Sequence, residues 1–326
     1  MNPIYRYLIL LFLILFNALL YLELGGEPRA NERPPQAGEP PYLVVLGIAQ
    51  DAGFPQAACR KDCCADVWKN PESRRLVSCL GIVDPQTGQR WMIDATPDFR
   101  EQLRRLDELF PVEASPGIEG IFLTHAHIGH YTGLMQLGHE VMGAKETKVY
   151  SMPRMKTYLE TNGPWDQLVR YKNISLQSLE DGKPVQLNEN LKIIPFLVPH
   201  RDEYSETVGY RIEGPDRSGI FIPDINKWET WSRRVEDVFA NADVAYLDGA
   251  FYADGEIPGR NMSEIPHPFI AESMARFKDL PDSEKAKIHF IHLNHTNPAL
   301  DDRGEARKEI NKNGFRVAAE LEKFGL

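Results

Sequence analysis

The stretch THAHIGHYTG (Thr124–Gly133) places His125, His127 and His130 within six residues. One residue separates the first two histidines, so just past a strand end both imidazoles can turn toward one point. Borderline-soft divalent ions bind neutral imidazole readily, and three such nitrogens with one open position form a catalytic zinc site. Gly129 stands where an oxygen ligand for a second ion would complete another site. The stretch predicts bound metal and leaves open whether there is one ion or two.

Further candidate ligands occur where other predicted strands end. LKIIPFLVPH ends on His200, SGIFIPDI carries Asp224 near its end, and KIHFIHLNH contains His292. Sites gather where strands run out at one edge of packed sheets. A lone histidine is more often a surface or hydrogen-bonded core residue, but this repeated placement favours a metal site. The candidate ligands are His125, His127 and His200 for a first ion, Asp224 as a bridge, and His130 and His292 for a second ion.

Strands alternate with amphipathic helices from Tyr42 to the C-terminus. The apolar run YLVVLGIA starts the pattern, and SCLGIVDP with QRWMIDA predicts a hairpin around residues 86–88. Helices are expected at Trp228–Ala240 and Glu264–Lys278. Strands with helices on both sides predict an α/β fold, a four-layer αββα sandwich formed by one domain over residues 42–326.

The N-terminal residues 1–26 differ from the rest of the chain. Leu8–Leu22 is almost purely apolar and follows Arg6, which predicts an export signal or a membrane anchor. The positive charge before the run and Glu23 after it would keep the N-terminus cytoplasmic and export the remainder. A cleavage site of small residues is poorly formed, which slightly favours an anchor. Residues 27–41 are rich in Pro, Gly and charge and predict a linker, so we expect a periplasmic or other extracytoplasmic domain.

The net charge of −10 argues against a nucleic-acid partner, because phosphate backbones need clustered Lys and Arg. We therefore expect a small-molecule substrate.

Three of the four cysteines, Cys59, Cys63 and Cys64, lie within CRKDCC. Three thiolates and one imidazole would form a closed tetrahedral zinc site. The alternative is a disulfide, with Cys79 as a partner, since an exported protein can form one. Spacing alone does not decide between the two.

The histidine loop followed by a later His, an Asp and a final His resembles the metallo-β-lactamase superfamily, whose loop is His-x-His-x-Asp-His. The flanking motifs PQAACRKDCC, WMIDATPDFR, LDGAFY and IHLNHTNPALDD are similar to the pyrroloquinoline-quinone biosynthesis protein B family. The cysteine cluster and HLNH also resemble the phosphoribosyl cyclic phosphodiesterase branch, which is related to the tRNA-processing ribonucleases. The resemblance covers most of the chain from Tyr42 onward.

This resemblance implies the same two groups of ligands and adds two roles. It implies that His295 is the fourth ligand of the cysteine site, and that His267 is a general acid, with a loop or capping role as the alternative. Metal-ligating histidines generally need hydrogen-bond acceptors, so we expect Asp94 to brace the metal loop by hydrogen bonds. Gly129 departs from the pattern and removes one ligand of the second site. We expect one firmly bound ion, Zn²⁺ or alternatively Fe²⁺ or Mn²⁺, a second that is weak or absent, and a gain in second-site occupancy from Gly129→Asp.

The favoured function is a metal-dependent hydrolase that attacks a small ester, lactone or phosphodiester with a metal-activated water. Asp224 would orient the nucleophile and His267 would protonate the leaving group. The alternative is an iron-dependent oxidoreductase or hydroxylase like the quinone-biosynthesis family, because three histidines and a carboxylate accept Fe²⁺ as well as Zn²⁺. A binding protein on a decayed scaffold is a third hypothesis, which requires that His125, His127 and His200 do not converge.

Overall fold

The computed structural model describes residues 38–113 and 116–326. The predicted export segment, residues 1–26, and residues 27–37 of the predicted linker lie outside the described residues. Within the described part of the chain, no helix has the length and apolar character needed to cross a membrane. The first strand, β1 (Tyr42–Gly47), begins where the apolar pattern begins.

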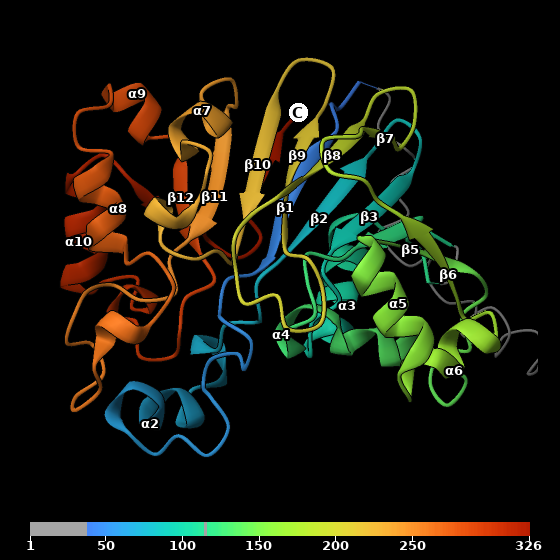
Figure 1. Ribbon diagram of the computed structural model, residues 1–326, viewed down its shortest axis with the longest axis horizontal. Coiled ribbons are helices and arrows are strands. Elements are labelled where there is room, and N and C mark those ends of the chain that lie inside the picture. Colours follow the sequence, from blue (N-terminus) through green and yellow to red (C-terminus); the bar gives the residue numbers. More distant parts are fainter. Residues whose placement is uncertain (1–37, 114–115) are drawn as a thin grey trace, which may run out of the picture. The chain divides into compact units, whose positions relative to one another are not determined.

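Two seven-stranded mixed sheets form the centre of the fold (Figure 1). The first sheet has the order β14-β1-β2-β3-β4-β5-β6, and the second has the order β13-β12-β11-β10-β9-β8-β7. The remaining strands of the first sheet are β2 (Cys79–Asp84), β3 (Gln89–Ile93), β4 (Gly120–Phe122), β5 (Thr147–Ser151), β6 (Ile174–Ser178) and β14 (Lys323–Gly325). Those of the second sheet are β7 (Val185–Gln186), β8 (Lys192–Leu197), β9 (Val208–Glu213), β10 (Ser218–Ile222), β11 (Val244–Asp248), β12 (Ile288–Ile291) and β13 (Arg316–Val317).

The two sheets pack face to face. In β1, Leu43 and Val45 belong to the core shared with the second sheet, and Val44 and Leu46 belong to the core on the helical side. A strand with both faces buried is expected to be apolar throughout, as β1 is. The sheets approach so closely at Gly219 of β10 that a Cβ there would lie 2.6 Å from Leu43 Cδ1. Glycine at this position permits the contact.

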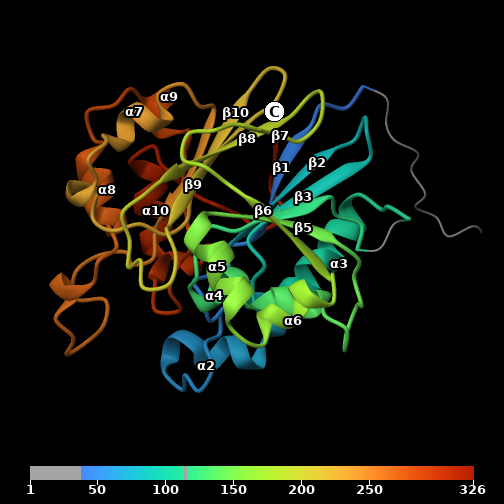
Figure 2. The ribbon, with the colours of Figure 1, turned by 45° about the vertical axis from the view of Figure 1, so that its right-hand side comes forward.

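Helices cover the outer face of each sheet (Figure 2). The first sheet carries α3 (Phe99–Leu109), α5 (Pro153–Thr161) and α6 (Trp165–Arg170), whose apolar residues join its outer core. The second sheet carries α7 (Val235–Phe239), α8 (Ile270–Arg276) and α10 (Glu305–Lys312). The predicted four-layer αββα sandwich is confirmed. The other α-helices in the described residues are α2 (Asp62–Lys69), α4 (Ile128–Tyr131) and α9 (Asp282–Lys285).

Two predicted helices are shorter than expected. The helix predicted at Trp228–Ala240 is a 3-10 turn at Trp228–Thr230 followed by α7. The Trp228 indole is buried and donates to Ser273 Oγ at 2.9 Å, so packing onto α8 overrides the local helical preference. The helix predicted from Glu264 begins at Ile270, because the prolines of EIPHPF disfavour helix immediately before them.

Strand direction places the candidate site. β3 and β4 are parallel, and β1 runs in their direction because it is antiparallel to β2, which is antiparallel to β3. In the second sheet, β10, β11 and β12 are parallel to one another. β8 runs in the direction of β10, because β9 between them is antiparallel to both. The carboxyl ends of β4, β8, β10 and β12 supply the loops that carry the predicted ligands, as expected for sites at strand ends.

Candidate metal centre

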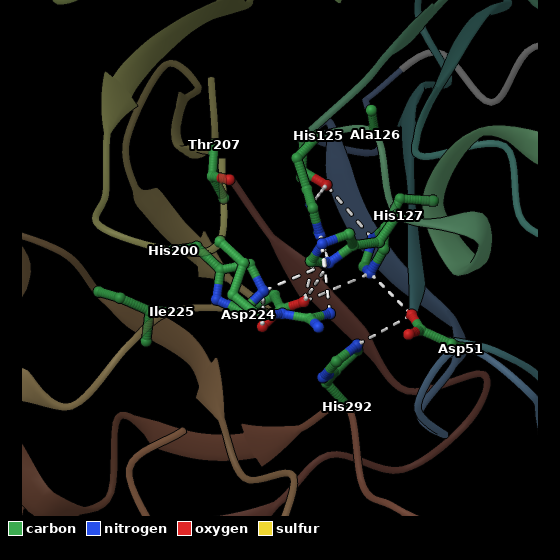
Figure 3. A network of polar contacts seen from close by, with 12 residues as sticks. Asp51, His125, Ala126, His127, His200, Thr207, Asp224, Ile225 and His292 are labelled. Atoms are coloured by element: carbon green, nitrogen blue, oxygen red, sulfur yellow. Dashed lines mark hydrogen bonds and ion pairs between the residues drawn. The ribbon is translucent and has the colours of Figure 1, made fainter. Parts of the chain in front are cut away.

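The first group of donors surrounds the Asp224 carboxylate, which follows β10 (Figure 3). His125 Nε2 lies 3.2 Å from Asp224 Oδ2, and His200 Nε2 lies 3.2 Å from Oδ1. His127 Nδ1 lies 2.9 Å from His125 Nε2 and 3.3 Å from His200 Nε2. Ligands about 2.0–2.1 Å from a tetrahedral zinc ion are about 3.3 Å apart. These four side chains therefore fit one divalent ion.

A second group of donors lies on the other side of Asp224. His130 Nε2 lies 3.3 Å from Asp51 Oδ1, and His292 Nε2 lies 3.7 Å from the same oxygen. Asp224 Oδ2 is 3.9 Å from His130 Nε2, so this carboxylate stands between the two groups. All six predicted active-site ligands are brought together. His125, His127 and His200 converge, whereas the hypothesis of a binding protein on a decayed scaffold required that they do not.

Buried hydrogen bonds hold the imidazoles in orientation. Thr124 Oγ1 lies 3.0 Å from His125 Nδ1, and Asn226 Oδ1 lies 3.2 Å from His200 Nδ1. His130 Nδ1 donates to Asp94 Oδ2 at 2.7 Å. Each contact occupies Nδ1 and leaves Nε2 directed at the centre, as such partners do around metal ligands.

Two site residues adopt backbone conformations that are uncommon for side chains other than glycine. Asp94 has φ 71° and His292 has φ 66°. Such residues cost free energy and cluster at functional sites, where the surrounding structure maintains them. Here they follow directly on the ends of β3 and β12 and turn both side chains into the centre.

The protonation states suit cation binding in the first group. Burial would raise the pKa of Asp224, but the charges of His200 and His267 hold it well below its usual range. Burial and the charge of His130 lower the pKa of His125 well below its usual value. An ionised carboxylate and a neutral imidazole are the forms that bind metal.

Several buried polar atoms of the centre have no hydrogen-bond partner among the described residues. They are Asp51 Oδ1, His130 Nε2, Asp224 Oδ1 and both ring nitrogens of His292. A buried polar atom without a partner costs about 1–3 kcal/mol. His130 Nε2 and His292 Nε2 face Asp51 Oδ1, and Asp224 Oδ1 faces His200 Nε2. Cations bound in the two groups would satisfy these four atoms, so the residues present fit a metal centre.

His267 lies beside the first group and is held by Asp248. Its Nδ1 is 2.8 Å from Asp248 Oδ2 and 3.3 Å from Asp224 Oδ1. Asp248 also accepts from the backbone N–H groups of Ile225 and Ala250, so its oxygens are engaged in hydrogen bonds. Burial would lower the pKa of His267, but Asp248 and Asp224 raise it to about 9. Both carboxylates therefore favour the protonated imidazole, which carries a proton to donate.

The centre is accessible from the side of His127. The His127 Nε2 atom lies 3.2 Å from Glu203 Oε2 and 3.3 Å from Arg201 Nη2, and both partners are about half exposed. Beside Glu203 is a hollow of about 400 Å³, lined in part by Arg154 and Tyr204. Glu203 is thus an exposed residue in contact with a ligand of the first group.

The comparisons with known proteins agree with this geometry. A family model described as "Beta-lactamase superfamily domain" matches residues 89–290. The chain belongs to the metallo-β-lactamase superfamily. Coenzyme PQQ synthesis protein B of Methylorubrum extorquens is 27% identical over 306 residues, covering 85% of this chain and 97% of that protein. The same protein of Methylococcus capsulatus is 27% identical over 303 residues, with 85% and 97% covered.

Solved structures of the superfamily share the fold. Zn²⁺-bound PqqB from Methylobacterium extorquens superposes with a TM-score of 0.74 at 22% identity, covering 87% of this chain and 100% of that chain. A diphosphatase from the PhnP family gives a TM-score of 0.61 at 21% identity, with 88% and 97% covered. At these identities the likeness shows the fold alone.

Asp51, in the loop after β1, is the residue of the centre that was missed from the sequence. The superfamily loop pattern directs attention to residues 125–130, and Asp51 lies far upstream in GIAQDAG. The available signal was its position: like Asp224, it is an acidic residue just after a buried strand.

The gain in occupancy predicted for Gly129→Asp does not fit the structure. A Cβ at position 129 would lie 2.2 Å from Asp51 Oδ1 and 2.5 Å from Asp51 Cα. Any side chain there therefore requires the loop after β1 to move, and an added carboxylate would displace the one already present.

The cysteine cluster brings Cys59, Cys63, Cys64 and His295 together. Cys63 Sγ lies 3.8 Å from Cys59 Sγ and 4.0 Å from Cys64 Sγ. Sulfurs about 2.3 Å from a tetrahedral zinc ion are about 3.8 Å apart, whereas a disulfide needs about 2.05 Å. All four cysteines are free, and Cys79 is buried in β2 with its Sγ 3.6 Å from Asp94 O. The arrangement favours metal over a disulfide, and adjacent cysteines converge because both lie in the first turn of α2.

Asp94→Asn is expected to weaken the second group without unfolding the protein. Asp94 accepts from Thr124 N at 2.8 Å through Oδ1 and from His130 Nδ1 through Oδ2. Asn tolerates the positive φ, but its NH₂ group must face one of these two donors. We expect about 1–3 kcal/mol lower stability and about 10–100-fold weaker metal affinity. Isothermal titration with Zn²⁺ and thermal melts measure both.

Asp84→Asn is the matched control, because Asp84 is equally buried and accepts from Asn188 Nδ2, outside the centre. It should lower stability and leave metal affinity unchanged. Equal metal affinity in Asp94→Asn and the wild type would contradict a bracing role for Asp94.

Proposed function

We propose that the chain is a metal-dependent hydrolase that acts on a small ester, lactone or phosphodiester. The position of Asp224 carries the proposal. Its two oxygens face His200 and His125 on one side, and Oδ2 is 3.9 Å from His130 on the other. A carboxylate between two groups of imidazoles suits the binding and orientation of a nucleophilic water. A bound divalent ion lowers the pKa of water to about 7 and polarises the scissile bond.

The residues of the chain have distinct roles in this proposal. His125, His127 and His200 would hold the first ion, and Asp224 would orient the attacking water by accepting a hydrogen bond from it. His267 donates a proton to the leaving group from Nε2, because its Nδ1 is engaged with Asp248. General acid catalysis of this kind contributes about 10²–10⁴-fold.

The surroundings of the centre support a small substrate. The first-group ligands are buried except for part of His127, so access is narrow. Arg201 and Glu203 both lie at this opening. The net charge of −10 opposes binding of a long polyanion such as RNA. The PhnP-family neighbour is named a diphosphatase, which supports including phosphate esters among the substrates.

Metal analysis and a substrate screen test the proposal. The purified full chain is examined for bound Zn, Fe and Mn, and then assayed with p-nitrophenyl esters, lactones, bis(p-nitrophenyl) phosphate and a chromogenic β-lactam. The Asp224→Asn variant is the inactive reference. We expect metal-dependent turnover of an ester or phosphodiester by the wild type alone. Equal turnover in both proteins, or turnover unaffected by complete removal of metal, would refute the proposal.

His267→Gln is expected to lower kcat by about 10²–10⁴-fold and to leave KM and metal content nearly unchanged. The physical reason is loss of the proton donor, since His267 is not among the first-ion ligands. The decrease should be large for alkyl leaving groups and small for p-nitrophenolate, which departs without protonation. Steady-state kinetics on both substrate types measure this difference.

His289→Gln is the control, because His289 lies in β12 and its Nδ1 contacts Glu322, away from the centre. It should behave as the wild type. If His267→Gln lowers kcat equally for alkyl and p-nitrophenolate leaving groups, His267 positions other residues and does not donate the proton.

The named relatives favour one second candidate, an iron-dependent oxidoreductase. Coenzyme PQQ synthesis protein B matches over 97% of its own length, and its name places it in cofactor biosynthesis. The same histidines and carboxylate accept Fe²⁺. Native metal analysis followed by an oxygen-consumption assay distinguishes the two. Bound iron with substrate-dependent oxygen uptake would favour the oxidoreductase.

A further inference from the structure

The second group of donors contains a carboxylate that the superfamily loop pattern does not supply. Asp51 follows β1, and its side chain is 27% exposed, whereas its Oδ1 atom is buried. This oxygen is 3.3 Å from His130 Nε2 and 3.7 Å from His292 Nε2. Neither nitrogen has a hydrogen-bond partner among the described residues. Three donor atoms thus face one another across distances that suit a common ion.

Gly129 and Asp51 are complementary in space. The ideal Cβ of residue 129 would lie 2.2 Å from Asp51 Oδ1 and 2.9 Å from Asp51 Cβ. The carboxylate from the loop after β1 therefore occupies the volume into which a side chain at position 129 would project. An aspartate at 129 and Asp51 in its present position exclude each other, so glycine at 129 is what admits Asp51.

The backbone fixes the loop that carries Asp51 next to the loop that carries His292. Gln50 N donates to Leu293 O at 2.8 Å, and Asn294 Nδ2 donates to Gln50 Oε1 at 2.6 Å. Gln50, which precedes Asp51, is thus hydrogen-bonded to Leu293, which follows His292. Ligands placed in advance by such contacts bind a metal with less loss of conformational freedom.

We propose that Asp51 replaces the missing loop aspartate as the carboxylate ligand of a second divalent ion, so that the active site binds two ions bridged by Asp224. The second site then has two imidazoles, one carboxylate of its own and the shared carboxylate. This composition restores the ligand whose loss at Gly129 led to the expectation of a weak or empty second site, and its negative charge offsets that of the added cation. The inference rests on the proposed function, because it takes the centre to be a metal centre.

Cobalt binding to the full chain tests the proposal without an activity assay. Co²⁺ at the cysteine cluster gives thiolate charge-transfer bands, whereas Co²⁺ at the histidine sites gives only d–d bands, so the two are counted separately. The wild type is expected to bind two ions at the histidine sites. Asp51→Asn is expected to bind one, with the affinity of the other lowered by more than about 100-fold, beyond the effect of losing an outer-shell partner.

Two further variants make the result decisive. Asp51→Ala should also lose one ion from the histidine sites. Unchanged thiolate bands in both Asp51 variants would show that the neighbouring loop remains folded. Asp282→Asn, a fully exposed carboxylate at the start of α9, should retain both ions. The proposal is overturned if the wild type binds one ion at the histidine sites, or if Asp51→Asn retains both with unchanged affinity.

The metal count is separable from the proposed function. Two ions that depend on Asp51, in a protein that hydrolyses none of the substrates, would refute the hydrolase and leave the role of Asp51 intact. Hydrolysis by a protein whose metal content does not depend on Asp51 would support the hydrolase and refute the role of Asp51.

Discussion

Asp224→Asn is expected to abolish hydrolysis, with kcat/KM lowered by more than about 100-fold and both active-site ions weakened. Asp224 is 2% exposed and stands within 4 Å of five imidazoles, those of His125, His127, His130, His200 and His267. The amide has nearly the same shape, so packing is retained. It carries no charge, however, and one of its two polar atoms can only donate.

The loss of charge decides the size of this effect. Each ion loses the anionic ligand that it shares with the other, and one side of the amide presents N–H groups to a cation. Substitution of groups that merely orient ligands already costs about 10–100-fold, so a bridging ligand should cost more. Equilibrium dialysis against Zn²⁺ and the substrate screen measure the two losses.

Comparison with Asp51→Asn separates bridging from single-site binding. Asp224→Asn should weaken both ions, whereas Asp51→Asn should weaken one. If Asp224→Asn retains full metal content at both sites, Asp224 does not bridge them. If it loses metal but retains activity, the metal centre is not the site of hydrolysis.

The fold was accessible from the sequence because the signals that define it are local and periodic. The run YLVVLG at residues 42–47 is apolar on both faces, and this alone places β1 between two layers. His125, His200, Asp224 and His292 were found because each follows a strand that could be recognised on its own. Chain direction within the sheets then brings these strand ends together.

Asp51 was not predicted because its role depends on contact between distant segments. Nothing near GIAQDAG indicates that the loop after β1 passes over position 129. Within its own loop, Gly129 only removes a ligand. In the structure, the absence of a side chain at position 129 leaves the space that Asp51 fills. Short patterns identify ligands that are close in sequence and miss a ligand transferred to another loop.

Removal of the cysteine cluster is expected to weaken the active site as well as the fold. Two segments connect the two centres: one runs from Asp51 to Cys59, and the other from His292 to His295. Burial raises the pKa of Cys64 to about 12, so a bound cation is required to hold this thiol as a thiolate. An ion at the cluster would therefore fix both segments and, through them, two ligands of the second site.

Cys64→Ser is expected to lose the thiolate-bound ion and to lower stability by about 4 kcal/mol, as loss of a metal site can. For a domain of this size, that corresponds to a decrease of roughly 10 °C in Tm. The second active-site ion should weaken about 10-fold, as for loss of an outer-shell partner, and the first ion should be unaffected. Cobalt spectroscopy and thermal melts of the full chain measure these quantities.

Cys79→Ala is the matched control, because it removes a buried thiol that lies in β2, outside the cluster. It should retain all bound ions. Its free energy of unfolding should fall only by the cost of a small cavity, which depends on the size of that cavity. If Cys64→Ser weakens both active-site ions equally, the effect is a general loosening of the fold. If it weakens neither, the two centres are independent, and hydrogen bonds such as that between Gln50 and Leu293 are sufficient to hold Asp51 in place.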